Sequence, residues 1–224
     1  MSGSMTRLLA AGAVGVLGVA LTATTAATAV ADEYESHTVQ ADVDGDGSLD
    51  DVTLTEVSPT SQTLTFALAG GPVEVTIEGD ASYPLQQPRP VDVNSDGTHE
   101  IMVAEYVGAN TVTFNAWYYD PARGKIFPVA NPDGSRLQVY EGGGAAARSG
   151  YNCFDYPDTG DRDLEALNAR LVDSSGEVPL FDGTRIRYHV EDGVAREVQR
   201  FEYEAIPGDD PRLDTDPRSC GAIV

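Results

Sequence analysis

The sequence predicts an all-β fold made of antiparallel meander units. Apolar and polar residues alternate along short segments, as they do where Val73, Val75 and Ile77 are separated by polar residues. Turn-forming residue pairs that contain glycine separate such segments, at residues 70–71, 133–134 and 192–193. A nine-residue loop pattern that starts at residue 42 starts again at residue 92, which indicates an internal repeat.

Residues 1–31 are predicted to form a secretory signal peptide. Arg7 precedes an apolar run over residues 8–21, and small residues then lead to an A-x-A ending at Ala29 and Ala31. The alternative is a membrane-spanning helix, but the run is shorter than the roughly 20 residues that a span needs. We therefore expect a secreted protein with no membrane span in the mature chain.

Residues 32–206 are expected to form the repeat domain, in units of about 36–85, 86–147 and 148–206. The segments with strand-like patterns are residues 52–57, 63–69, 73–78, 101–107, 111–119, 126–130, 137–140, 184–190 and 195–203. Residues 164–172 are open to two interpretations. Leu164, Leu167 and Leu171 have helical spacing, whereas the repeat predicts a strand there. The glycines and alanines of residues 142–147 are expected to form a flexible connector between the second and third units.

Residues 207–224 are expected to be an acidic C-terminal tail tied to the domain by a disulfide. Cys153 and Cys220 are the only two cysteines. In an oxidising compartment they most simply pair with each other. Two unpaired buried thiols are the alternative.

The charge of the chain excludes several classes of partner. There are 36 acidic residues against 14 lysines and arginines, and the formal net charge is -22. Such a chain offers no basic surface for nucleic acid and no electrostatic attraction to an anionic membrane. The hydrophobic content of 41% is too high for a disordered acidic polymer, so a packed core is expected.

Three related loops are visible in the sequence. Loop A (residues 42–50) has acidic residues at positions 1, 3, 5 and 9 and glycine at position 6. Loop B (residues 92–100) has oxygen-bearing side chains at the same four positions and again glycine at position 6. Loop C (residues 155–163) keeps Gly160 and Asp163 at positions 6 and 9, but Pro157 and Thr159 stand at positions 3 and 5.

Loops A and B resemble the calcium loops of FG-GAP, or VCBS-type, repeats, the units that build the β-propeller of integrin alpha chains. The resemblance implies that each loop joins two strands of a blade and wraps one Ca2+. It also implies four side-chain ligands and one backbone carbonyl in each loop. In loop A the side chains are those of Asp42, Asp44, Asp46 and Asp50, and the carbonyl is that of Ser48. In loop B the side chains are those of Asp92, Asn94, Asp96 and Glu100, and the carbonyl is that of Thr98. Three units are fewer than the four to eight blades of a closed propeller. We therefore expect blade-like sheets arranged as an incomplete propeller or a stacked sandwich.

The chemistry of these loops independently favours Ca2+. This ion takes six to eight hard oxygen ligands, and short acidic side chains at alternate positions of a tight loop converge on one point. An EF-hand or dockerin loop would need an acidic residue at position 12, where this chain has Thr53 and Val103. The alternative, that both loops are plain polar turns, does not account for the repetition of four ligand positions.

The sequence contains no recognisable catalytic motif. It has no G-x-S-x-G, no phosphate-binding glycine loop and no H-E-x-x-H. His37, His99 and His189 are expected to be surface or packing residues. A glycosidase-like pair of carboxylates cannot be located among so many acidic residues. The aromatic residues Trp117, Tyr118 and Tyr119 favour core packing over sugar stacking.

The sequence thus predicts a secreted, non-enzymatic, Ca2+-binding β-repeat protein, an extracellular binding or adhesion-type module whose partner is an extracellular protein or a glycan. Two alternatives remain at this point. One is a secreted polysaccharide-acting hydrolase with structural Ca2+, and the other is a carbohydrate-binding module centred on Trp117.

Overall fold

A computed structural model describes residues 34–79 and 84–221, which belong to one compact unit that begins at Tyr34. The predicted signal peptide, residues 1–31, lies outside the described residues. Within the described ranges, no helix is long and apolar enough to cross a membrane.

The described residues form an all-β fold, as the sequence predicts. All nine predicted strand segments coincide with strands, and most of these strands extend a few residues further. The strands are β1 (Ser36–Ala41), β2 (Asp50–Ser58), β3 (Ser61–Leu68), β4 (Gly71–Glu78), β5 (Arg89–Val91), β6 (Glu100–Val107), β7 (Thr111–Asp120), β8 (Lys125–Pro128), β9 (Gln138–Gly142), β10 (Ala147–Asp155), β11 (Arg162–Asp173), β12 (Leu180–Glu191) and β13 (Val194–Pro207). Two short 3-10 helices follow, η1 (Pro211–Leu213) and η2 (Pro217–Cys220).

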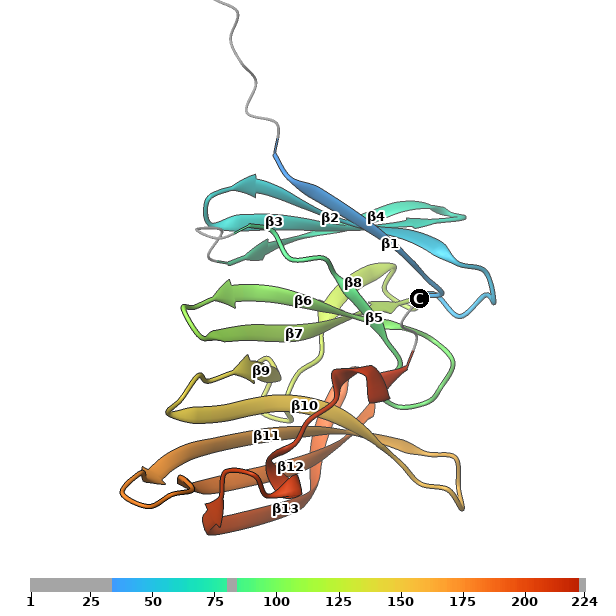
Figure 1. The fold of residues 1–224 in the computed structure, drawn as a ribbon. Helices are drawn as coiled ribbons and strands as arrows, with labels where there is room; N and C mark the ends of the chain where they lie inside the picture. Colours follow the sequence, from blue (N-terminus) through green and yellow to red (C-terminus); the bar gives the residue numbers. More distant parts are fainter. Residues whose placement is uncertain (1–33, 80–83, 222–224) are drawn as a thin grey trace, which may run out of the picture. The chain divides into compact units, whose positions relative to one another are not determined.

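The strands form two antiparallel sheets (Figure 1). The first has four strands in the order β1-β2-β3-β4. The second has nine strands, eight of which follow the order β13-β12-β11-β10-β9-β7-β6-β5, while β8 pairs with β7 off this path. Each unit begins with the same arrangement: a first strand, a loop, and a second strand that pairs with the strand that follows it in the sequence. Loop A lies between β1 and β2, loop B between β5 and β6, and loop C between β10 and β11.

The second and third units are joined through β9 and β10. The predicted flexible connector at residues 142–147 is instead a short turn between these strands. Gly142 and Ser149 are paired across β9 and β10, and the amide of Gly143 donates to the carbonyl of Asn110 at 2.6 Å. Gly142, Gly143 and Gly144 all have positive φ, which is the conformation that lets this turn form.

Residues 164–172 form part of β11, so the strand interpretation is confirmed and the helical one is wrong. Leu164 faces the core between the second and third units, whereas Leu167 and Leu171 belong to a separate core on the other face of the strand. The helical spacing of the leucines misleads because β11 is buried on both faces. The first strands of the units, β1, β5 and β10, were not predicted, because they are short or polar and glycine-containing and show weak alternation.

The central pair of strands, β6 and β7, lies between two cores. Ile101 and Val103 face the first sheet, where they contact a core that also holds Leu64 and Phe66. Met102 and Ala104, which alternate with them, face the core shared with the third unit. The β6–β7 pair, which lies between the first sheet and β10 in Figure 1, therefore packs apolar side chains against both neighbours.

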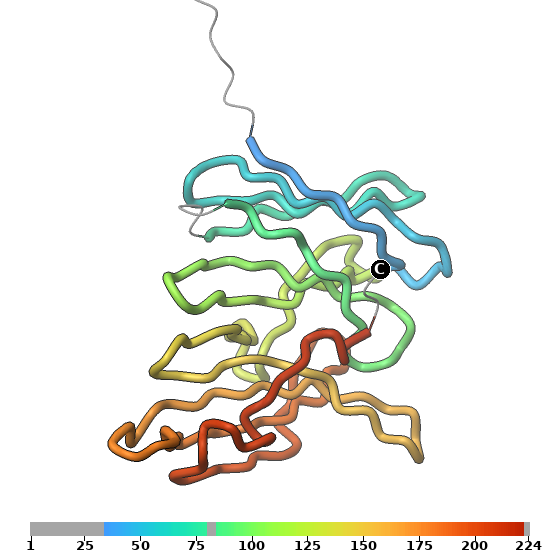
Figure 2. Tube along the Cα trace, in the orientation of Figure 1, coloured from blue at the N-terminus to red at the C-terminus, as the bar shows by residue number. Residues whose placement is uncertain are grey.

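The C-terminal tail is attached by more than the predicted disulfide, which is confirmed between Cys153 and Cys220. Figure 2 shows the tail running back across the third unit. Leu213 is buried in the third core, and the buried guanidinium of Arg185 donates to the carbonyls of Arg212 and Asp214 at 2.8 and 2.6 Å. The tail also runs close to the backbone of β10, since a Cβ atom on Gly150 would lie 1.9 Å from the hydroxyl oxygen of Thr215.

Removing the disulfide is expected to destabilise the fold without changing it. The Cys153→Ala, Cys220→Ala double variant should lose up to roughly 4 kcal/mol of unfolding free energy on the chain-entropy model, since the bridge closes a loop of 67 residues. Urea denaturation of the variant, and of the wild-type chain with and without reductant, measures this loss. An unchanged midpoint after complete reduction would contradict the expectation.

Candidate metal centre

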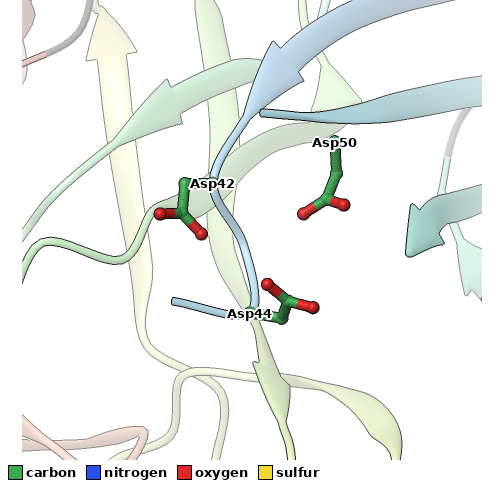
Figure 3. Close-up of side chains that lie close together, drawn as sticks. All are labelled: Asp42, Asp44 and Asp50. Atoms are coloured by element: carbon green, nitrogen blue, oxygen red, sulfur yellow. The ribbon is translucent and has the colours of Figure 1, made fainter. Parts of the chain in front are cut away.

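Loop A brings three acidic side chains together at the end of β1 (Figure 3). One carboxylate oxygen from each of Asp42, Asp44 and Asp50 lies within 4.8 Å of the other two. Asp42 and Asp44 are half-buried, and Asp50 is buried at the start of β2. In the described part of the chain, no other group of three acidic, histidine or cysteine side chains lies as close together.

Loops A and B are folded by the same five hydrogen bonds. The side chain at position 1 accepts from the amides of positions 4 and 6, position 3 accepts from position 5, position 5 from position 7, and position 9 from position 2. In that order the distances are 2.8, 3.0, 3.2, 2.7 and 3.4 Å in loop A. They are 2.6, 3.3, 3.2, 2.8 and 3.1 Å in loop B. The sequence repeat is therefore a repeat of three-dimensional structure.

The backbone turns at two positions in each loop. Position 6 has positive φ, 85° at Gly47 and 88° at Gly97, which explains the glycine recognised in the sequence. Position 4 also has positive φ, 76° at Gly45 and 62° at Ser95. Sequence reasoning missed this second turn, although Gly45 in loop A was a signal for it. Ser95 occupies a left-handed conformation that disfavours side chains.

A buried carboxylate closes each loop at position 9. Asp50 is 7% exposed and Glu100 is 5% exposed. Burial, together with the nearby Asp96 and Asp92, raises the pKa of Glu100 to about 8 against the lowering effect of the Val93 amide. Burial likewise raises the pKa of Asp50. A carboxylate in such a place is stabilised either by a proton or by a cation.

The remaining predicted ligands lie at the mouth of each loop. Asp46, Ser48 and Asp96 are exposed, and Thr98 is half-buried. In loop B, the Asn94 amide nitrogen and the Thr98 hydroxyl donate to Asp96, at 2.9 and 2.5 Å. These bonds hold Asp96 to its neighbours. Position 3 of loop B is Asn94, so positions 1, 3 and 9 of this loop carry two acidic side chains where loop A carries three.

Loop C has a different structure, in which neighbouring side chains form hydrogen bonds and ion pairs with its acidic side chains. The Arg162 guanidinium donates to Asp155 at 2.5 Å. Asp163, which is 3% exposed, accepts from the Tyr156 hydroxyl at 2.7 Å and lies 3.1 Å from Nδ1 of His189. Loop C keeps one of the five bonds, from the Asp161 amide to the Thr159 hydroxyl at 3.2 Å, and has an arginine beside its first carboxylate.

Successive loops contact each other in the same way. The amide of His99, at position 8 of loop B, donates to the carbonyl of Asp42 at 2.8 Å, and the ring Nδ1 lies 3.2 Å from the same oxygen. The guanidinium of Arg162, at position 8 of loop C, donates to the carbonyl of Asp92 at 2.9 Å. Sequence reasoning treated His99 as a surface or packing residue and missed this role, for which only its place in the repeat was a signal.

The donor set fits Ca2+. The predicted ligand side chains of both loops offer hard oxygen atoms, and neither sulfur nor imidazole nitrogen lies among them. The carboxylates at positions 1, 3 and 9 of loop A repel one another and gain most from a doubly charged cation. Loop B, with an amide at position 3, carries one negative charge fewer.

Trp117 lies in the core and offers no surface for sugar stacking. The side chain is 2% exposed, and its indole nitrogen donates to the buried carboxylate of Glu105 at 3.1 Å. Arg136 pairs with the same carboxylate and lies over the indole ring, 5.3 Å from its centre. The predicted preference for core packing is confirmed for Trp117, and a carbohydrate site centred on this residue is excluded.

No protein-family model, no curated protein and no solved structure matches the chain. The resemblance to FG-GAP and VCBS-type repeats therefore depends on the residues of loops A and B.

The buried glutamate of loop B is expected to make stability depend on pH when Ca2+ is removed. The pKa of Glu100 is about 8 in the folded chain, whereas the ordinary pKa of a glutamate, which we take for the unfolded chain, is 4.5. Between these values the folded state binds more protons than the unfolded state, so the unfolding free energy falls as pH rises from about 4.5 to about 8 and levels off above. The fall attributable to this residue is on the order of a few kcal/mol.

Urea denaturation in EDTA across this pH range measures the effect. Glu100→Gln should flatten the slope, whereas Glu78→Gln, a matched change at an exposed glutamate of β4, should retain it. Equal slopes in wild type and Glu100→Gln would contradict the expectation.

Proposed function

We propose that this protein is a secreted, Ca2+-binding all-β module that acts by binding an extracellular partner. One observation carries the proposal: loops A and B share the same five side-chain-to-backbone hydrogen bonds and the same two backbone turns. Polar turns without a ligand would not be expected to share all five hydrogen bonds and to bury the carboxylate at position 9.

Each loop would hold one Ca2+ through its own oxygen atoms. Asp42, Asp44 and Asp50 are the core of the set in loop A, with Asp46 and the carbonyl of Ser48 at the mouth. The second set consists of Asp92, Asn94, Asp96 and Glu100, with the carbonyl of Thr98. The bound ion would supply positive charge that offsets the repulsion and burial of the carboxylates.

Metal binding would stabilise the junctions between units. Loop A is bonded to loop B through Asp42 and His99, and a Cβ atom on Gly45 would lie 2.9 Å from the Thr98 methyl group. An ion that orders either loop thus also orders the contact between the first two units. Since Ca2+ binds the folded loops and not the unfolded chain, it raises stability by mass action.

Secretion is supported by the N-terminal pattern and by the disulfide between Cys153 and Cys220. Millimolar Ca2+ outside the cell suits sites of this kind. The alternative of a polysaccharide hydrolase has no comparable support. The buried carboxylates of Glu105 and Glu165 are paired with arginines, Glu105 with Arg136 and Glu165 with Arg185 and Arg187.

Added Ca2+ is expected to raise the melting temperature, and EDTA to lower it. Saturation at 100 times the dissociation constant contributes about 2.7 kcal/mol per site. Two sites should therefore shift the melting temperature by on the order of 10 °C in a domain of this size. Differential scanning calorimetry across Ca2+ concentrations measures the shift, and isothermal titration gives the number of ions bound.

The paired variant Asp44→Ala, Asn94→Ala should abolish most of the shift, because it removes position 3 of both loops. Asp133→Ala is the matched control. Asp133 starts an Asp-Gly turn and accepts from Ser135, but has no ligand spacing around it. No shift in the wild-type chain, or the same shift in the paired variant, would overturn the proposal.

A further inference from the structure

A groove of about 860 Å3 lies where the first strands of the three units approach one another. β1, β5 and β10 all line it, through residues such as Val39, Pro90 and Tyr151, and their labels can be followed in Figure 1. The segment before β5 and the helix η2 complete its walls. A second groove, of about 560 Å3, is by contrast lined by residues of the third unit alone, such as Asn168 and Tyr203. Pockets that bind small molecules have volumes of about 300 to 1,000 Å3.

The groove contains a prearranged polar group. Arg89 donates to both carboxylate oxygens of Glu141, at 2.6 and 3.2 Å, and lies 3.4 Å from the hydroxyl of the fully buried Tyr151. The ring of Phe114 supports the guanidinium from one side, at 4.5 Å. A bidentate pair of this kind is held rigidly, and its outer donors and acceptors lie in one plane.

The walls combine amide side chains with apolar surface. Gln40, Gln86 and Gln87 line the groove, and each amide both donates and accepts hydrogen bonds. Pro88 and Pro217 also line it. Such walls suit a ligand that has hydroxyl groups around its edge and apolar faces.

The charge of the groove differs from that of the chain. Its lining has two arginines, Arg89 and Arg218, and two acidic residues, Glu141 and Asp216, whereas the whole chain has 36 acidic residues against 14 basic ones. The local balance offers no net positive charge for an anionic ligand, and the surrounding negative charge repels one.

We propose that this groove binds a neutral oligosaccharide. The inference deepens the proposed binding function and rests on it, because it names the partner class. Vicinal hydroxyls of a sugar each donate and accept, as the Arg89–Glu141 pair and the glutamine amides also do. The apolar faces of the sugar rings would lie on the half-buried Pro90, Pro217 and Val39.

An extended peptide fits the groove less well. A peptide would add a strand along β1, the edge of the first sheet. Leu85 already lies beside one end of that edge, where its amide donates to the side-chain carboxylate of Glu35 at 3.1 Å and its carbonyl lies 3.1 Å from Nε2 of the His37 ring.

Binding is tested with the full chain at saturating Ca2+ by isothermal titration and ligand-observed NMR. The probes are the hexasaccharides of the cellulose, xylan, starch and chitin series, and a proline-rich decapeptide of zero net charge. We expect at least one hexasaccharide to bind, with a loss of at least tenfold in affinity for Arg89→Gln and severalfold for Gln87→Ala.

Matched controls separate a role in the groove from a general effect. Arg170→Gln alters an arginine paired with Asp182 outside the groove, and Gln138→Ala alters an exposed glutamine of β9. Both should retain wild-type affinity. Gln87 is exposed, so Gln87→Ala tests the groove even where Arg89→Gln impairs folding.

Three results would overturn the inference: no hexasaccharide binds, binding is unchanged in both groove variants, or only the peptide binds. The Ca2+-dependent melting shift, measured on the same samples, tells this failure apart from a failure of the proposed Ca2+ function. An intact shift without sugar binding rejects the groove as a glycan site and leaves the Ca2+ proposal standing.

Discussion

A buried carboxylate at the ninth position of each loop is the constraint on which the structure depends. Asp50, Glu100 and Asp163 stand at or next to the start of the second strand of their units and are 7%, 5% and 3% exposed. A charge in this place needs a compensating group. In loop C, Tyr156 and His189 lie against the carboxylate. In loops A and B the carboxylate accepts from one backbone amide, and the proposed Ca2+ would supply the compensating charge.

The same loops also fix the order in which the units stack. Position 8 of one loop bonds to the first carbonyl of the loop before it, through His99 and then through Arg162. The eighth residue of loop A, Leu49, has no preceding unit and is 61% exposed. Leu49 instead lines the groove beside β1. The repeat therefore produces both the junctions between the units and one wall of the cavity that they share.

Much of the fold and of the candidate metal site could be predicted from local patterns. Alternation and turn residues identified nine strands, and the spacing of the acidic residues identified both loops. The rest depends on contacts between distant residues. The helical spacing of Leu164, Leu167 and Leu171 did not reveal a strand buried on both faces. The left-handed backbone at Ser95 and the contact of His99 with Asp42 follow from the tertiary fold, and no short window of sequence contains them.

The means of stabilisation change along the chain. Loop A gathers three carboxylates, loop B replaces one ligand position by Asn94, and loop C has the guanidinium of Arg162 beside Asp155. The acidic ligand positions become fewer from loop A to loop C, whereas covalent and buried ionic links are found toward the C-terminus. The disulfide and the Glu165–Arg185 pair both belong to the third unit or its tail. An arginine is a permanent cation, whereas Ca2+ comes from solution. On the proposed Ca2+ function, dependence on the metal therefore lies in the first two units, whereas the third unit and the tail are held by the disulfide and by arginine–carboxylate pairs.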